Sequence, residues 1–146
     1  AAGLFGWMLV YLRAPERIVG GMAALASSPW EVLLILNAAL LVLGCFMEGI
    51  AVMLLTIPIF LPILAQFGIS PLHFGVVMTL NLMIGLLTPP VGMCLYAIAT
   101  ISNVPVWRLI RELVPFILAI AVVLVLITYI PALVTWLPDR VLGGGS

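Results

Sequence analysis

A helix-breaking motif interrupts an apolar stretch in the middle of the sequence. One apolar run leads into Gly85-Leu86-Leu87-Thr88-Pro89-Pro90-Val91-Gly92, and a second run continues from it to Ile101. The two prolines have no backbone N–H and clash with the preceding turn, while the glycines relax the flanking backbone, so a helix is predicted to break here. In a membrane, such a break survives only inside protein or beside a polar cavity, because freed carbonyls need partners. The motif therefore predicts a polar ligand, above all an ion.

Composition places the chain in a bilayer. Apolar residues make up 66% of the 146 residues and charged residues only 7%, which is typical of integral membrane proteins. The formal net charge is zero and lysine is absent from the sequence, so neither nucleic-acid binding nor a polybasic membrane-surface patch is indicated. Cys45 and Cys94 lie in apolar runs without metal-ligand spacing, so no transition-metal site or disulfide is predicted.

The two ends of the chain carry little chemistry. Residues 1–30 are expected to hold the end of a transmembrane helix, up to Arg13, and then an interfacial helix of small, uncharged residues. Ser28-Pro29-Trp30-Glu31 combines a helix cap, a first-turn proline and an interfacial tryptophan, which predicts a new helix start. Residues 143–146 read Gly-Gly-Gly-Ser and are interpreted as a linker or tag.

Residues 31–66 predict a re-entrant helical hairpin. Two apolar runs, 32–47 and 50–65, are separated by Glu48 and Gly49. Each run has roughly 16 residues, or about 24 Å of helix, which is short of the roughly 20 residues that a full span needs. Two short arms joined by a polar tip suit a segment that enters and leaves the membrane on one side.

Residues 72–102 are predicted to form a discontinuous transmembrane helix, because the halves on either side of the Thr-Pro-Pro motif are each too short to span. Residues 106–137 are expected to hold an arginine-containing interfacial helix over 106–112, followed by an uninterrupted scaffold span that ends at Trp136. One helical face carries most of the polarity before each interruption. In the hairpin this face holds Asn37, Leu41, Gly44 and Glu48, and in the broken helix it holds Asn81, Gly85 and Thr88.

The residue types at the two interruptions favour a sodium-binding transporter. Discontinuous helices in transporters direct freed carbonyls at coupling ions, and a hard cation takes oxygen ligands, to which Thr88 adds a hydroxyl. Glu48 is a functional candidate because acids inside membranes are rare. Its alternative role, in which it reaches water or caps neighbouring amides, stays open. Pro58 and Pro62 are interpreted as ordinary kinks, and His73 as an interfacial side chain.

Other classes of function are less well supported. No His-Glu-x-x-His, no Gly-x-Ser-x-Gly and no acids paired on one helix face occur, so the chain is not expected to be an enzyme. A channel would present a continuous polar stripe, whereas polarity here gathers at two interruptions. The main alternative is a non-transporting structural membrane subunit or fragment whose helix breaks serve packing only.

Several stretches of the chain resemble the large membrane (M) subunit of TRAP transporters, the tripartite ATP-independent periplasmic carriers. The likeness covers residues 1–142 and is carried by these segments: residues 44–51, residues 58–64, Pro71-Leu72-His73-Phe74-Gly75 and residues 81–92. It implies sodium-driven uptake of an organic acid, such as a dicarboxylate or sialic acid, across the bacterial inner membrane by an elevator-type movement. The implied partners are a small membrane (Q) subunit, a periplasmic substrate-binding protein and lipid.

The resemblance also implies the architecture and the site residues. The family's large subunit has two inverted repeats, each with a hairpin and a broken helix, so this chain matches one repeat of an all-α transporter and needs the remaining part of the large subunit. Na+ is the expected coupling ion, with no other cofactor, and its implied ligands are Gly85, Thr88 and Val91. Relatives more commonly have Met-Asp-Pro where this hairpin tip has Met47-Glu48-Gly49.

The implied substrate site combines the hairpin tip with the broken helix. No arginine lies near either interruption in the sequence, so backbone amides at the two tips are the candidates for holding a carboxylate. The implied substrate and hairpin-tip residues are Gly44, Met47, Glu48, Gly49, Asn81, Pro89, Pro90 and Gly92.

Overall fold

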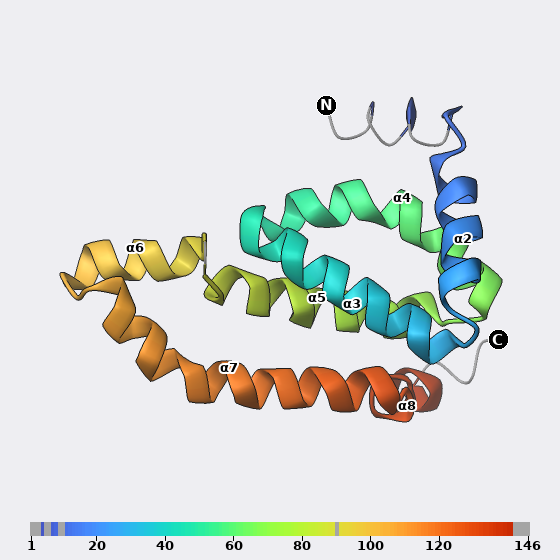
Figure 1. Ribbon diagram of the computed structural model, residues 1–146. Coiled ribbons are helices and arrows are strands. Elements are labelled where there is room, and N and C mark those ends of the chain that lie inside the picture. Colours follow the sequence, from blue (N-terminus) through green and yellow to red (C-terminus); the bar gives the residue numbers. More distant parts are fainter. Residues whose placement is uncertain (1–3, 5–6, 9–10, 90, 142–146) are drawn as a thin grey trace.

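The computed structural model describes residues 4, 7–8, 11–89 and 91–141 of the chain (Figure 1). Every assigned element within these residues is a helix, which confirms the all-α fold class. The elements in chain order are α2 (Ala14–Leu25), α3 (Pro29–Phe46), α4 (Gly49–Phe67), α5 (Pro71–Leu87), α6 (Met93–Ser102), α7 (Val106–Tyr129) and α8 (Ala132–Val141).

The predicted helix start at Ser28 is confirmed. The Ser28 side chain accepts a hydrogen bond from the backbone N–H of Glu31 at 3.5 Å. In return, the Glu31 carboxylate accepts from the backbone N–H groups of Ser27 and Ser28 at 2.7 Å and 3.4 Å. This reciprocal arrangement satisfies amides that the first turn of α3 leaves free, and Pro29 occupies a position where no helical donor is needed.

The hairpin consists of α3 and α4, which run antiparallel and are joined at a tip formed by Met47 and Glu48 (Figure 1). The expectation of short arms is wrong, because the helices extend at their outer ends to 18 and 19 residues. Helix α4 also continues through Pro58 and Pro62. Each arm is long and apolar enough to cross a membrane, so the re-entrant course of the hairpin stays a prediction.

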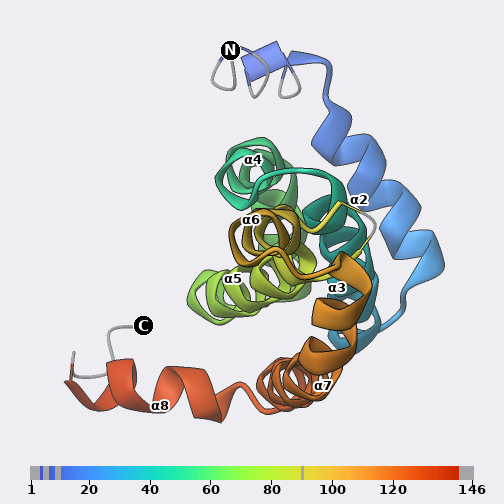
Figure 2. The same ribbon diagram turned by 90° about the vertical axis from the view of Figure 1, so that its left-hand side faces the viewer.

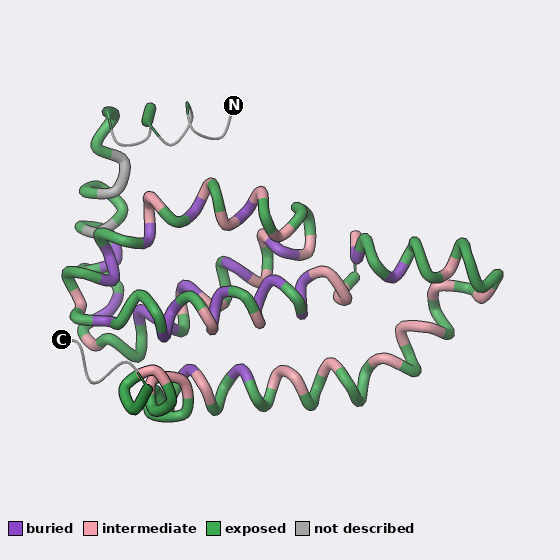
Figure 3. The backbone as a smooth tube through the Cα atoms, turned by 180° about the vertical axis from the view of Figure 1, so that it is seen from behind, coloured by how far each residue is buried: buried purple, intermediate pink, exposed green. Residues whose placement is uncertain are grey.

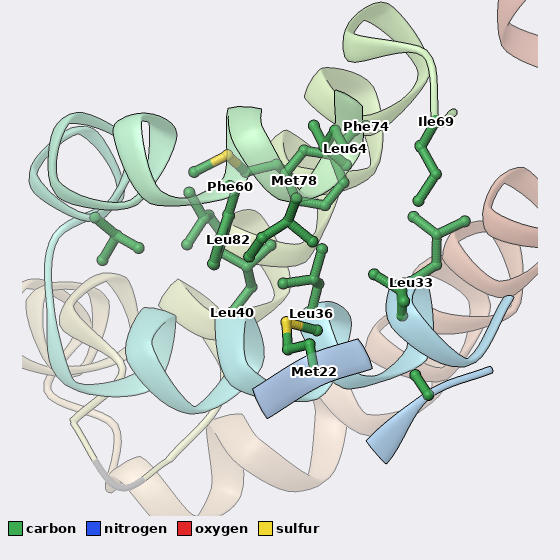
Figure 4. Packing of buried hydrophobic residues seen from close by; sticks show 14 residues of the cluster. Met22, Leu33, Leu36, Leu40, Phe60, Leu64, Ile69, Phe74, Met78 and Leu82 are labelled. Atoms are coloured by element: carbon green, nitrogen blue, oxygen red, sulfur yellow. The ribbon is translucent and has the colours of Figure 1, made fainter. Parts of the chain in front are cut away.

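The main hydrophobic core lies between the hairpin and α5 (Figure 4). Buried leucines of α3 face aromatic and aliphatic side chains of α4 and α5, and Phe60 meets Phe74 edge to face with ring centroids 5.6 Å apart. Helix α2 adds Met22 to this core. The first part of the broken helix is therefore packed against both arms of the hairpin.

The two halves of the predicted discontinuous helix are α5 and α6, of 17 and 10 residues. Helix α6 extends beyond the core, and α7 returns along α5 (Figures 1 and 2). Most of α6 and α7 is exposed, whereas the buried residues gather on α3, α4 and α5 (Figure 3).

Helix α7 differs from the expected interfacial helix and separate span. A single helix of 24 residues covers Val106–Tyr129 and stops short of Trp136. Pro115 lies inside this helix without ending it, so the arginine-containing turns and the apolar turns belong to one element. At the other end, Pro131 cannot continue the helical hydrogen bonds of α7, and α8 begins just after it at Ala132.

Candidate functional site at the helix break

The hairpin tip and the break, residues 88–92, lie at the same end of the α3–α5 pair (Figure 1). Helices α3 and α5 run in the same direction and touch backbone to backbone. A Cβ placed on Gly85 would lie 2.6 Å from the carbonyl carbon of Gly44, closer than real side chains allow. Glycine is thus required at position 85, as in close helix contacts within membranes, while a Cβ on Gly44 would lie 3.3 Å from the Leu82 side chain.

A second contact brings the tip itself against α5. A Cβ placed on Gly49 would lie 3.7 Å from the Cβ of Leu82, an ordinary van der Waals distance. Gly49 is the first residue of α4, and Leu82 is buried one turn before Gly85. The tip therefore rests on the turn of α5 that leads into the break.

The break is held by Thr88 and Gly92. The Thr88 backbone N–H donates to the carbonyl of Gly85 at 3.1 Å, and its hydroxyl donates to the carbonyl of Ile84 at 2.6 Å. The hydroxyl oxygen keeps its lone pairs for a ligand. Gly92 has a φ of 36°, and a Cβ there would lie 3.2 Å from the carbonyl oxygen of Thr88. Only glycine fits this turn without strain.

Opposite helix ends meet at the break. Proline at positions 89 and 90 supplies no N–H to the carbonyls of Gly85 and Leu86, their normal helical acceptors. The C-terminal end of α5 therefore offers partial negative charge, and the N-terminal end of α6, which begins after Gly92, offers partial positive charge. The end of α5 therefore suits a cation, and the start of α6 suits a carboxylate.

Glu48 caps the second arm of the hairpin. Its two carboxylate oxygens accept from the backbone N–H groups of Ile50 and Ala51 at 3.0 Å and 3.1 Å. This contact corresponds to the capping role left open by the sequence. It also occupies two of the tip amides that were candidates for a substrate carboxylate, which leaves the α6 end as the freer of the two.

The structure brings most, but not all, of the predicted site residues together. At the tip, Met47 and Glu48 are exposed and Gly49 is half-buried. In the break, Thr88 and Val91 are half-buried. Their roles toward sodium or substrate stay predictions.

The remaining predicted residues divide between close packing and exposure. Gly44, Gly85 and Gly92 are buried and serve the two tight backbone contacts. Pro89 is exposed, and Pro90 lies outside the described residues. Asn81 is fully buried and bonds to α3 instead of facing the tip.

Asn81 belongs to a polar network that the sequence revealed only in part. Its Nδ2 donates to the side-chain oxygen of Asn37 at 2.6 Å and to the Asn37 carbonyl at 3.0 Å. The Asn37 Nδ2 in turn donates to the hydroxyl of Thr128 on α7 at 3.2 Å. The Oδ1 atom of Asn81 is buried without a partner among the described residues, which costs about 1–3 kcal/mol. Thr128 was missed, because one threonine in an apolar span carries no pattern.

His73 is not an interfacial side chain, contrary to the sequence-based expectation. Only 2% of its surface is exposed, and its Nε2 lies 2.6 Å from the carbonyl oxygen of Ile127 on α7. A carbonyl can only accept, so Nε2 carries the proton. The helical donor to Ile127 would be residue 131, a proline without N–H. His73 therefore supplies the hydrogen bond that Pro131 cannot.

Comparison with known proteins identifies the family. A family model described as "Tripartite ATP-independent periplasmic transporter, DctM component" matches residues 1–133. The chain belongs to the DctM family. This confirms the resemblance to the large membrane subunit of TRAP transporters, and members of this family are permeases and not enzymes. As a DctM-family chain with several apolar helices of spanning length, it is a multi-pass protein of the bacterial inner membrane.

Individual relatives carry substrate names. The chain is 37% identical over 98% of its length to the sialic acid TRAP transporter large permease protein of Vibrio cholerae. It is 40% identical over 94% of its length to the C4-dicarboxylate TRAP transporter large permease protein of Pseudomonas aeruginosa. These alignments cover 34% and 32% of the two relatives. The chain thus spans about a third of the length of the large permeases it matches.

Proposed function

We propose that this chain is the C-terminal part of a TRAP large permease and contributes one of its sodium-binding and substrate-binding repeats to the sodium-coupled uptake of an organic acid. The observation that supports this most is the backbone contact between Gly44 and Gly85, which brings the hairpin tip to the helix break. A structural subunit needs neither the opened carbonyls nor a second polar tip beside them. In secondary transporters, ion and substrate sites form at discontinuous helices of this kind.

Sodium is the proposed ligand of the α5 end of the break. The Thr88 hydroxyl and the backbone around Gly85 and Val91 supply oxygen atoms, which a hard cation prefers. The negative end of the α5 dipole adds to the attraction. The carboxylate of Glu48 is already bonded to two amides. Backbone carbonyls would therefore supply most of the negative charge that faces the sodium ion.

The proposed substrate is an organic anion bound at the α6 end. Relatives are named for sialic acid, C4-dicarboxylate and isethionate, each of which carries an acidic group. The N-terminal amides of α6 suit such a group, and the exposed hairpin tip lies at the same end of the α3–α5 pair as the break. The shared chemistry of the relatives supports the class of substrate and not a particular acid.

The proposed mechanism needs partners beyond this chain. Sites of this kind form between two inverted repeats, so the remaining part of the large subunit supplies the second repeat. A small membrane (Q) subunit, a periplasmic substrate-binding protein and surrounding lipid complete the proposed complex. Elevator-type movement would carry the hairpin and the broken helix across the membrane together.

The test is uptake by the complete complex reconstituted in liposomes with its binding protein. With sialic acid and a C4-dicarboxylate as trial substrates, an inward sodium gradient should drive accumulation of at least one, and a potassium gradient should not. Thr88→Val should raise the half-saturating sodium concentration several-fold. Thr100→Val is the matched control, since among the described residues that exposed hydroxyl bonds only within its own helix, to the carbonyl of Tyr96.

Two results would contradict the proposal. Equal uptake with sodium and potassium gradients would show that transport is not coupled to sodium. A normal sodium response in Thr88→Val would show that the ion does not bind at the break. It would support the alternative in which the break serves packing only.

A further inference from the structure

We propose that Asn81 and Asn37 are positioning residues that set the register between the hairpin and the broken helix, and thereby the sodium affinity at the break. The proposal rests on the proposed function, because it concerns the same sodium site. Neither side chain reaches the break. Both act through the position of the helices that carry the hairpin tip and Thr88.

The glycine contact alone leaves the register open. Gly44 and Gly85 let the two backbones meet, yet neither offers a side chain that would resist sliding of α3 along α5. A slide by one residue moves the hairpin tip by about 1.5 Å relative to the break. A displacement of this size would disrupt ion coordination, because ligand distances hold to within about 0.2 Å. Some other contact must fix the helices along their length.

The amide pair supplies that contact. Asn81 donates both of its N–H groups to Asn37, one to the backbone carbonyl and one to the side-chain oxygen. Two bonds from one amide to two atoms of a single residue fix both the rotation and the translation of α5 against α3. A single buried asparagine sets helix register in the same way in coiled coils.

The unpartnered oxygen of Asn81 argues against a role in packing alone. Asn81 is fully buried, and its Oδ1 has no donor among the described residues. An apolar residue of similar volume would fill the space without that loss. The amide is therefore better explained by the register that it specifies than by the stability that it adds.

Asn37 extends the same register to α7. Its Nδ2 donates to Thr128, whose own hydroxyl donates to the Leu124 carbonyl within α7. The chain of bonds thus runs from α5 through the first arm of the hairpin to the last turns of α7. All three helices keep one alignment around the site.

The experiment measures the sodium concentration that gives half-maximal uptake by the complete reconstituted complex carrying Asn81→Leu, Asn37→Leu or both. Each single variant should raise this concentration about three- to tenfold, the range expected for losing one or two interhelical hydrogen bonds. The double variant should shift by less than the two single shifts combined, because both substitutions remove the bond between the two side chains. The thermal midpoint without sodium should stay within a few degrees of the unsubstituted protein.

Thr56→Val is the matched control. Thr56 is also a buried polar residue of the hairpin, but within the described part of the chain its hydroxyl bonds only to the Val52 carbonyl of its own helix. Its half-saturating sodium concentration should not change. Asn81→Gln, which keeps the amide group, should recover part of the sodium affinity lost in Asn81→Leu.

The outcomes separate this proposal from the proposed function. An unchanged half-saturating sodium concentration in both leucine variants, with a normal sodium response in the unsubstituted complex, would overturn the positioning role alone. Equal shifts in Thr56→Val would also overturn it, since they would reflect general disturbance of the hairpin. No sodium response in the unsubstituted complex would overturn both.

Discussion

The hairpin and α7 are both apolar enough to cross a membrane, yet the chain covers them to different extents. In the apolar windows of α3 and α4, 28% of the residues are buried within the chain, against 6% in α7. The same contrast is visible along the whole backbone (Figure 3). Apolar composition therefore does not separate a helix that builds the site from one that borders it.

The contrast shows which contacts the chain determines by itself. Helix α3 makes its most extensive contact with α5, through glycine backbones and the Asn37–Asn81 amide pair. Helix α7 is held by two polar contacts, from His73 of α5 to the Ile127 carbonyl and from Asn37 of α3 to Thr128, and it leaves its outer face exposed. The geometry of the break is thus internal to this repeat, whereas the surroundings of α7 depend on lipid or on the rest of the permease.

The largest effect is expected from a methyl group at the α3–α5 crossing. In Gly85→Ala, the new Cβ would lie 2.6 Å from the Gly44 backbone, so the helices must separate. Overpacking of this kind costs about 1–3 kcal/mol, which thermal unfolding of the purified complete permease would show as a clear loss of stability.

Gly75→Ala is the matched control on the same helix. No atom lies within 4 Å of a Cβ placed at Gly75, and alanine favours helix over glycine by about 1 kcal/mol. Stability should therefore hold or rise. Equal losses in the two variants would contradict the close contact between α3 and α5.

A smaller effect is expected where α5 meets α7. His73→Leu removes the donor to the Ile127 carbonyl, and losing one interhelical hydrogen bond in a membrane costs about 0.6–1.7 kcal/mol. Thermal unfolding again measures the loss. Adding Pro131→Ala should restore part of the stability, because residue 131 then has an N–H for the same carbonyl. A second substitution that only adds to the loss would show that His73 does not replace the proline's missing donor.

An effect of similar size is expected at the hairpin tip. Glu48→Ala removes the cap from the Ile50 and Ala51 amides, and a lost helix cap costs about 1 kcal/mol. Glu48→Gln should cost less, because its amide oxygen still accepts a hydrogen bond. If Glu48 acts only as a cap, the half-saturating sodium concentration should be unchanged in Glu48→Gln. A large shift in that concentration would instead place the carboxylate in the ion site.

Local chemistry made part of this structure predictable. The Thr-Pro-Pro break, the hairpin tip at Glu48 and the helix start at Ser28 follow from proline, glycine and capping residues acting on their own neighbours. The family resemblance added the pairing of a hairpin with a broken helix. These features need no knowledge of what packs against them.

Tertiary contacts explain what the sequence could not supply. The partner of Asn81 became visible only once α3 and α5 lay side by side, and His73 was misread because its acceptor, Ile127, lies far along the chain. The arm lengths, by contrast, were underestimated because the apolar runs leave out the capped first turn of α3 and the last residues of α4 before Gly68. Hydrophobic periodicity identifies the apolar face of a helix, but it does not identify the element that packs against that face.

The most direct test of this account is whether the hairpin tip rests on α5 beside the break. In a complete permease with Cys45 and Cys94 replaced by alanine, Gly49→Cys and Leu82→Cys should form a disulfide under mild oxidation. The corresponding Cβ atoms would be 3.7 Å apart, within the usual range of about 3.5–4.5 Å. A protease site inserted at Gly68, between the two positions, reveals the bond, because the cleaved halves stay joined until they are reduced.

Gly49→Cys with Met83→Cys is the control pair, since Met83 neighbours Leu82 but is exposed. The first pair should cross-link rapidly and the second pair very little. Separation of the cleaved halves of the first pair, or equal cross-linking of both pairs, would contradict the contact between the hairpin tip and the broken helix.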